Sequence, residues 1–252
     1  MQARFDLVCG PARSGTSAMM LCLKKAGIEI GGFKYPLKVT NEMGQLVDAG
    51  TAIPMPNQLT RNPKGMWEYS SVALGGIQRI HQVYDGEIVK VLLQALTKCD
   101  PNLVGRVILM MRHPRNLLTA WQSIGDISGP DDADMKILSL VNNSVVAVRW
   151  MANSIIDFKI VLQEELMQDT MGTLKDICMW MSKGNPMMGT SGFDKKLVRS
   201  KKWEGNSEVI DLAEDFYKLF VDRNIDAIMR YDLNKLNETI QKVYVGMQEK
   251  HN

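Results

Sequence analysis

A glycine-rich turn near the start of the chain constrains the possible folds more than any other feature. Residues 5–9 form a short apolar run (FDLVC), residues 10–17 read GPARSGTS, and residues 18–26 (AMMLCLKKA) have a helical composition. This order predicts a buried strand, a tight loop and a helix. Backbone N–H groups converge at such a junction, and the positive end of the helix dipole favours a bound phosphate or sulfate.

Further short apolar runs alternate with helical stretches along the rest of the chain. We predict strands at residues 87–93, 106–111 and 159–163, and helices at 72–83, 115–124, 135–158, 173–182, 208–222 and 234–247. Residues 31–64 and 182–206 predict long loops. The alternation is typical of an α/β fold, a three-layer sandwich in which a central parallel sheet has helices on both faces. Since no repeat or linker divides the chain, we expect a single domain over residues 1–252.

Composition excludes several classes of partner. The 30 Lys and Arg residues nearly balance 28 Asp and Glu residues, so a broadly basic protein that binds nucleic acid or a membrane surface is not expected. The 4 cysteines form no CxxC pair and no zinc-like spacing with histidine, which predicts no metal centre. No apolar run approaches a membrane span, and no signal-peptide pattern is present, so we expect a cytoplasmic protein.

The loop has the spacing of a Walker motif but not its cation. The pattern is G-x4-G-T-S, and Thr16 stands where the Walker motif requires lysine. The positive charge lies inside the loop instead, at Arg13. The loss of the Walker lysine is a serious departure for an ATPase, but not for a loop that only binds a phosphate group. The alternative is an ordinary glycine-containing turn between a strand and a helix.

The sequence GPARSGTS resembles the 5′-phosphosulfate loop of the sulfotransferase family, of the bacterial and Golgi-like P-R-S-G-T type. Residues 62–68 (NPKGMWE) are similar to its N-P-x-G-x-x-E segment, and residues 88–91 (IVKV) to a strand that ends in lysine. Residues 107–121 (VILMMRHPRNLLTAW) resemble the strand–R-D-P-R–helix segment, and residues 160–166 (IVLQEEL) resemble the strand followed by R-Y-E-D-L. Residues 199–205 (RSKKWEG) are similar to the basic segment that closes over the nucleotide. The resemblance implies a P-loop NTPase-like fold and a single sulfotransferase-like domain.

Three positions depart from the family pattern. Ala120 stands where a serine usually binds the 3′-phosphate, with Thr119 and Ser123 on either side as candidate replacements. His113 replaces the aspartate of R-D-P-R. Leu92 occupies the position of the histidine base of the cytosolic enzymes, so the base must be another residue.

The resemblance implies 3′-phosphoadenosine 5′-phosphosulfate as the donor and no required metal. It implies that the loop holds the 5′-phosphate, that Arg112 pairs with the 3′-phosphate, and that Lys201 or Lys202 closes from the basic segment. The implied donor-binding residues are Arg13, Ser14, Gly15, Thr16, Ser17, Arg112, Ser123, Lys201 and Lys202.

Three residues are implied in catalysis. Arg13 would stabilise the charge that develops on the leaving phosphate, because its planar guanidinium suits two oxygens at once. Lys90, inside an apolar strand, must reach a polar partner and would stabilise the transferred sulfuryl group. Glu68 is the first candidate for the base that takes the acceptor proton, and His81 is the second.

The leading hypothesis is a sulfotransferase that moves a sulfuryl group, by in-line transfer, to a hydroxyl or amine of a small-molecule or glycan acceptor. A P-loop nucleotide kinase or NTPase is the second, although the strand ends offer Arg112 and Lys90 instead of the aspartate that would hold Mg²⁺. A non-catalytic nucleotide-binding relative is the third. The sequence assigns neither the acceptor nor an oligomeric state.

Overall fold

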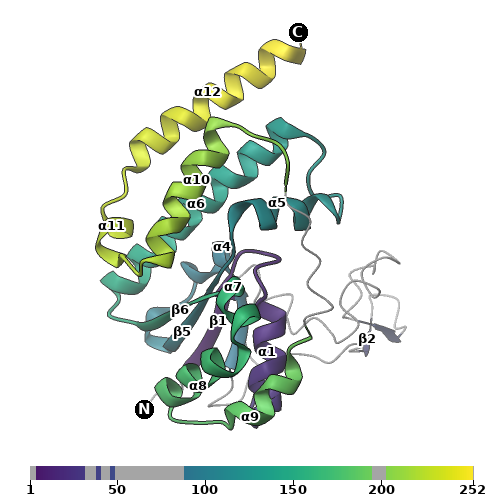
Figure 1. Ribbon diagram of the computed structural model, residues 1–252, viewed down its shortest axis with the longest axis vertical. Coiled ribbons are helices and arrows are strands. Elements are labelled where there is room, and N and C mark those ends of the chain that lie inside the picture. Colours follow the sequence, from purple (N-terminus) through teal and green to yellow (C-terminus); the bar gives the residue numbers. More distant parts are fainter. Residues whose placement is uncertain (1–3, 32–37, 41–45, 49–87, 195–202, 252) are drawn as a thin grey trace.

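The computed structural model describes residues 4–31, 38–40, 46–48, 88–194 and 203–251. Within them, a four-stranded parallel sheet has the order β4-β1-β5-β6, with β1 (Phe5–Gly10), β4 (Ile88–Leu92), β5 (Val104–Met111) and β6 (Asp157–Leu162) (Figure 1). All of β1 is buried between its two neighbours. A separate antiparallel pair is formed by β2 (Lys38–Thr40) and β3 (Leu46–Asp48). The α/β class expected from the sequence is confirmed.

Helices cover both faces of the sheet, because successive side chains of a strand point to opposite sides. Leu7 and Cys9 pack in the core that contains α6 (Pro130–Asn153) and α10 (Glu208–Val221). Val8 and Ile108 face the other way, toward α1 (Thr16–Lys25) and α8 (Thr170–Met181). Figure 1 shows these two helical layers on either side of the strands. The remaining helices are α4 (Leu93–Leu96), α5 (Pro114–Gln122), α7 (Gln163–Gln168), α9 (Pro186–Gly189), α11 (Ile225–Met229) and α12 (Leu233–His251).

The long helix begins and ends five residues earlier than the predicted range of 135–158. Pro130 occupies its first turn, with Asp131 and Asp132 beside it, and all three residues suit a helix N-terminus. Asp131 and Asp132 therefore belong to the first turn of α6. At the other end Ile155 has a left-handed φ of 54°, which stops the helix before β6.

The prediction of a loop over residues 182–206 is wrong for residues 186–192. Asn185 accepts a hydrogen bond from the Met187 backbone N–H and begins α9, and a 3₁₀ turn (Thr190–Gly192) follows it. This turn packs closely on α1, since a Cβ on Gly192 would lie 2.7 Å from the Cys22 backbone N. An element of four residues carries too little periodicity to be recognised in the sequence.

The predicted helix at 72–83 and nearly all of the predicted loop at 31–64 lie outside the described residues. Among the described helices, none combines the length and the apolar character needed to cross a membrane.

Candidate functional site

The loop between β1 and α1 lies at the carboxyl end of the sheet. Gly10 ends the strand where a Cβ would come within 2.5 Å of the Met110 carbonyl oxygen, so only glycine fits there. Arg13 and Gly15 both have left-handed backbones, with φ of 73° and 93°. Gly15 is the N-cap of α1, and among the described residues no side chain caps this end. The first-turn N–H groups of α1, which have no partner inside the helix, therefore face the loop.

Lys90 brings a buried charge to this junction from the neighbouring strand. It pairs with Val8 in the register of β4 and β1, and only 4% of its surface is exposed. Its Nζ donates a hydrogen bond of 2.9 Å to Ser17 Oγ in the first turn of α1. Ser17, in the first turn of α1 directly after the loop, is thus the polar partner that the sequence predicts for this lysine.

Arg112 brings a second buried cation from the end of β5. It is 6% exposed, and its Nη1 donates to the carbonyl oxygen of Arg13 over 2.9 Å. Burial lowers the pKa of this guanidinium, Glu164 opposes that shift, and the nearby Arg13 adds to it. Guanidinium groups in proteins remain protonated even so, and Arg112 keeps its positive charge.

The residues around Arg112 form a hydrogen-bonded frame. Glu164, the second residue of α7, accepts from the backbone N–H of His113 at 3.1 Å and from Asn116 Nδ2 at 3.0 Å. Its other oxygen accepts from the hydroxyl of Tyr217 at 2.8 Å. Burial and the adjacent carboxylate raise the pKa of Tyr217 far above its ordinary value. Glu164 thus joins the start of α5 to α10 beside the candidate site.

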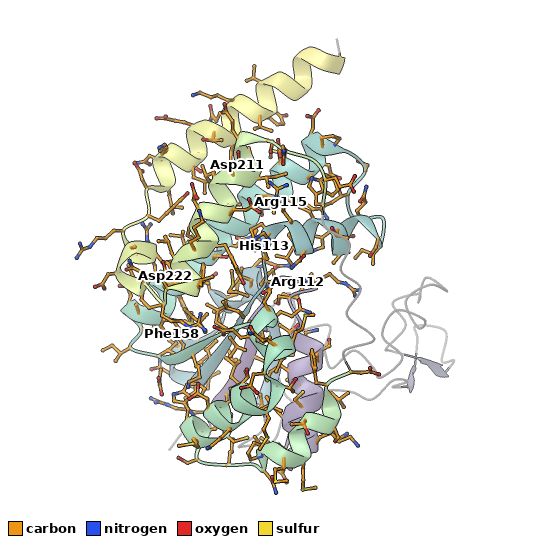
Figure 2. All side chains as sticks on the ribbon, viewed as in Figure 1. Arg112, His113, Arg115, Phe158, Asp211 and Asp222 are labelled. Carbon is orange, nitrogen blue, oxygen red and sulfur yellow. The ribbon has the colours of Figure 1, made fainter. Side chains whose placement is uncertain are left out.

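Arg115 has a different role from Arg112, although the two residues are three positions apart. Its guanidinium donates to Glu214 Oε1 at 2.7 Å, and to the Gly205 carbonyl and Asn206 Oδ1 at 2.9 Å each. Figure 2 shows Arg115 between α5 and α10. It ties the segment that leads into α10 to the start of α5.

Seven of the predicted site residues gather at the carboxyl edge of the sheet: Arg13, Ser14, Gly15, Thr16, Ser17, Lys90 and Arg112. Ser123 lies elsewhere, exposed at the C-cap of α5, where its hydroxyl donates to the Ala120 carbonyl oxygen. The neighbouring Thr119 hydroxyl donates to the Arg115 carbonyl oxygen. The part of Ser123 in donor binding stays a prediction.

Four further candidates lie outside the described residues: Glu68, His81, Lys201 and Lys202. Their roles stay predictions as well.

Two residues of the site were not recognised in the sequence. Gln163 directly follows β6 and lies against Gly15, since a Cβ on that glycine would be 3.3 Å from Gln163 Cγ. Glu164 follows it in the frame described above. A usable signal was present, because polar residues directly after a buried parallel strand lie at the edge where ligands bind.

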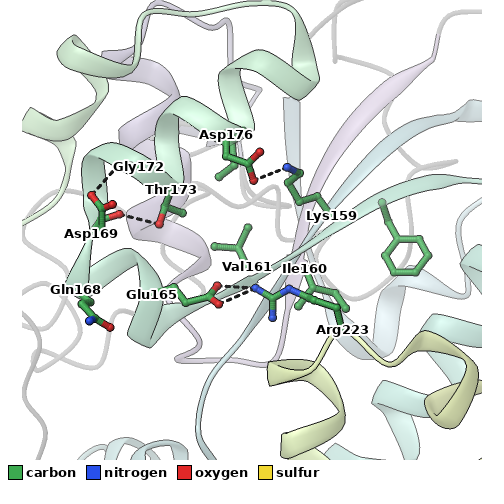
Figure 3. Close-up of a pocket in the computed structure, with 12 residues that line it drawn as sticks. Lys159, Ile160, Val161, Glu165, Gln168, Asp169, Gly172, Thr173, Asp176 and Arg223 are labelled. Atoms are coloured by element: carbon green, nitrogen blue, oxygen red, sulfur yellow. Dashed lines mark hydrogen bonds and ion pairs between the residues drawn. The ribbon is translucent and has the colours of Figure 1, made fainter.

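A cavity lies away from the loop, at the outer side of β6. It measures about 620 Å³ and is lined by Phe158, Lys159, Ile160, Val161, Glu165, Gln168, Asp169, Gly172, Thr173, Asp176, Ile177 and Arg223. Figure 3 shows its two cations, and each is paired with a carboxylate: Arg223 with Glu165, and Lys159 with Asp176. This cavity includes no residue of the loop, both of its cations are paired with carboxylates, and Asp169 adds a further negative charge. The site with anion-binding chemistry is therefore the loop.

Side chains typical of metal sites do not gather in the part of the chain that the structure describes. No group of three or more His, Cys, Asp or Glu residues is placed there to hold an ion. The four cysteines, Cys9, Cys22, Cys99 and Cys178, are buried and form no disulfide bond. Burial raises the pKa of the Cys9 thiol, which keeps it protonated.

Comparison with solved structures gives a likeness at the level of the fold. No family model and no curated protein matches the chain. A solved sulfotransferase domain from the olefin synthase of Synechococcus PCC 7002 has 12% sequence identity and a TM-score of 0.45, over 86% of this chain and 96% of that one. Because both figures are low, the functional proposal rests on the residues of the site itself.

Proposed function

We propose that the chain transfers a sulfuryl group from 3′-phosphoadenosine 5′-phosphosulfate to a hydroxyl or amine acceptor. The observation that carries this proposal is the pair of buried cations on either side of the uncapped start of α1. Lys90 contacts Ser17 from β4, and Arg112 contacts the Arg13 backbone from β5. Two such charges suit a small ligand with several negative groups, although the whole chain has a net charge of only +2.

The residues present fit this donor. The left-handed backbone at Arg13 and Gly15 bends the chain around one point, and Ser14 Oγ is buried without a hydrogen-bond partner among the described residues. We infer that backbone N–H groups of Ser14, Gly15 and Thr16 bind the 5′-phosphate, together with the hydroxyls of Thr16 and Ser17. Arg112 binds the 3′-phosphate, and Lys201 and Lys202 add charge from the basic segment.

The donor, when bound, supplies a sulfuryl group whose bond to the 5′-phosphate oxygen breaks as a bond to the acceptor oxygen or nitrogen forms. Arg13 stabilises the negative charge that accumulates on the departing bisphosphate. Lys90 stabilises the sulfuryl oxygens during the in-line transfer. Glu68 takes the proton that the acceptor loses. The acceptor is a small molecule or a glycan.

A nucleotide kinase is the main competing function. It needs a carboxylate near the loop to hold Mg²⁺. Arg112 and His113 follow β5, and Glu164, after β6, already accepts three hydrogen bonds. These contacts favour an anionic donor bound by protein cations.

Calorimetry with adenosine 3′,5′-bisphosphate, compared with ATP with and without Mg²⁺, tests the proposal. We expect the bisphosphate to bind without metal and more tightly than adenosine 5′-phosphate, because Arg112 adds a contact to the 3′-phosphate. Arg112→Met should reduce bisphosphate affinity to that of adenosine 5′-phosphate, and Arg230→Met, at an exposed position, should change neither affinity. Metal-dependent ATP binding with no response to the bisphosphate would contradict the proposal. If no compound in a panel of hydroxyl and amine acceptors is sulfated, the hypothesis that remains is a non-catalytic nucleotide-binding protein.

A further inference from the structure

The cavity beside β6 follows an open edge of the parallel sheet. In the described part of the chain, β6 pairs with β5, and no strand lies on its other side. Residues 158–161, which are consecutive in β6, all line the cavity. The next N–H along the strand, that of Leu162, donates to Glu165 Oε2 on the same outer side at 3.3 Å. Because backbone groups alternate in direction along a strand, the N–H and C=O groups of Phe158 and Ile160 also point outward, to the cavity.

The cavity has walls on both sides of this edge. Side chains of α7 and α8 form one wall, and Arg223, which follows α10 on the opposite face of the sheet, forms the other. Figure 3 shows Arg223 reaching Glu165 at one side of the cavity and Lys159 reaching Asp176 at another. The volume of about 620 Å³ between these walls suits a single extended chain. The β6 strand of a second copy would bring equivalent walls with it, and those walls would occupy the same space.

The charges that line the cavity favour a basic occupant. Lys159 pairs with Asp176, and Arg223 pairs with Glu165. Asp169 is exposed and has no cation beside it among the described residues, and its Oδ1 accepts a hydrogen bond from the Gly172 N–H at 2.8 Å. The lining therefore has one negative charge in excess, which a lysine or arginine of the occupant would balance.

We infer that this cavity binds an extended, basic segment of a partner protein, which adds a strand to the sheet beside β6. Hydrogen bonds to the outward N–H and C=O groups of Phe158 and Ile160 hold its backbone, and a lysine or arginine of the segment pairs with Asp169. The cavity contains no residue of the loop, so this interaction is separate from the proposed transfer reaction.

Hydrogen exchange of the backbone amides, followed by NMR, tests the state of the edge in the chain alone. The N–H groups of Lys159 and Val161 point to β5 and should exchange slowly. The N–H groups of Phe158 and Ile160 have no strand beside them among the described residues and should exchange faster.

The same amides report the binding of a probe peptide. The probe is Val-Lys-Val-Lys-Val-Lys with blocked ends, and its control has glutamate in place of each lysine. We expect the lysine peptide to bind and to slow exchange at Phe158 and Ile160 by about tenfold. The glutamate peptide should bind more weakly, because it brings like charges to the carboxylates.

Two matched variants test the charge. Asp169→Asn removes the charge but keeps a side chain that can cap α8, so the fold should be retained. It should weaken binding of the lysine peptide about threefold to fivefold, the effect of one exposed ion pair. Glu238→Gln makes the same change of charge at an exposed position of α12 and should not alter the affinity.

Three results would overturn the inference. If Phe158 and Ile160 exchange as slowly as Lys159 and Val161 in the chain alone, the edge is already covered, by a second copy if the protection depends on protein concentration and otherwise by the chain itself. If the lysine peptide fails to bind, or binds without slowing these amides, it adds no strand. If the glutamate peptide or the Asp169→Asn variant gives the same affinity, Asp169 does not select a basic segment. Each of these failures would leave the affinity for adenosine 3′,5′-bisphosphate, and with it the proposed function, unchanged.

Discussion

Replacing Lys90 by methionine separates the effect of its buried charge on stability from the effect of that charge on ligand binding. Lys90 is 4% exposed, and its Nζ donates a hydrogen bond of 2.9 Å to Ser17 Oγ. Methionine fills a similar volume without a charge to desolvate, and replacing a buried charge by an apolar side chain is often neutral or stabilising. Ser17 is half-buried and can turn to water when it loses this donor. We therefore expect the free energy of unfolding to change by less than about 1 kcal/mol.

Binding should respond much more strongly. Two unit charges about 4 Å apart attract by about 4 kcal/mol at an effective dielectric constant of about 20, and a hydrogen bond to a charged group contributes about 1.5–3 kcal/mol. Part of this gain is offset by desolvation of the ligand. A net loss of about 2–3 kcal/mol corresponds to an affinity for adenosine 3′,5′-bisphosphate that is about 30- to 150-fold lower.

Calorimetry measures the affinity of the Lys90→Met variant, and urea titration measures its free energy of unfolding. Lys159→Met is the matched control, a strand lysine that is paired with Asp176 away from the loop. It should leave the affinity unchanged. An unaltered affinity in Lys90→Met, or a loss of stability above about 3 kcal/mol with no binding defect, would refute the reasoning.

Three more predictions concern the loop, the helix packing and the frame. Arg13→Gly should abolish sulfuryl transfer. It should also raise the free energy of unfolding by up to about 1 kcal/mol, because φ at this position is 73°, which glycine adopts without strain. If urea titration shows a lower free energy of unfolding instead, the arginine side chain supports the fold. Gly192→Ala should cost about 1–3 kcal/mol because its Cβ would meet the α1 backbone at 2.7 Å, whereas Gly129→Ala, with nothing within 4 Å, should cost less in the same titration. Its remaining cost comes from the N-cap of α6, where alanine is less favourable than glycine. Burial and Glu164 raise the folded-state pKa of Tyr217 above 10.0, so its contribution to stability is present below pH 10 and is lost as the pH rises further. Tyr217→Phe should therefore lose less stability above pH 10 than the original chain does. If the two proteins have the same pH profile of stability, Tyr217 does not cause the loss.

The sheet and the first strand–loop–helix unit could be predicted because their signals are local. Residues 5–9 and 106–111 are apolar runs of strand length, and the structure has β1 and β5 there. The ends of α6 are harder to predict from the sequence, because Pro130 and Ile155 set them through local backbone geometry and not through hydrophobic periodicity. Periodicity finds the middle of a helix better than its ends.

The site could be predicted only where one motif contains its residues. The loop residues 13–17 are consecutive, so their proximity needs no knowledge of the fold. Gln163 and Glu164 contact residues that lie about 50 or more positions away along the chain, including His113 and Tyr217. No periodic pattern encodes such contacts, which exist only once the sheet has aligned β1, β5 and β6.

The contacts made by the segment that directly follows β6 depend on its length. Gln163 lies against the loop, Glu164 accepts hydrogen bonds from α5 and α10, and Glu165 pairs with Arg223 before α11. Three consecutive residues thus contact three different parts of the molecule. Deleting Gln163 would move Glu164 and Glu165 each into the position of the residue before it, and would set a carboxylate against the loop for which we propose an anion. This short segment should therefore tolerate many single substitutions better than any change of length.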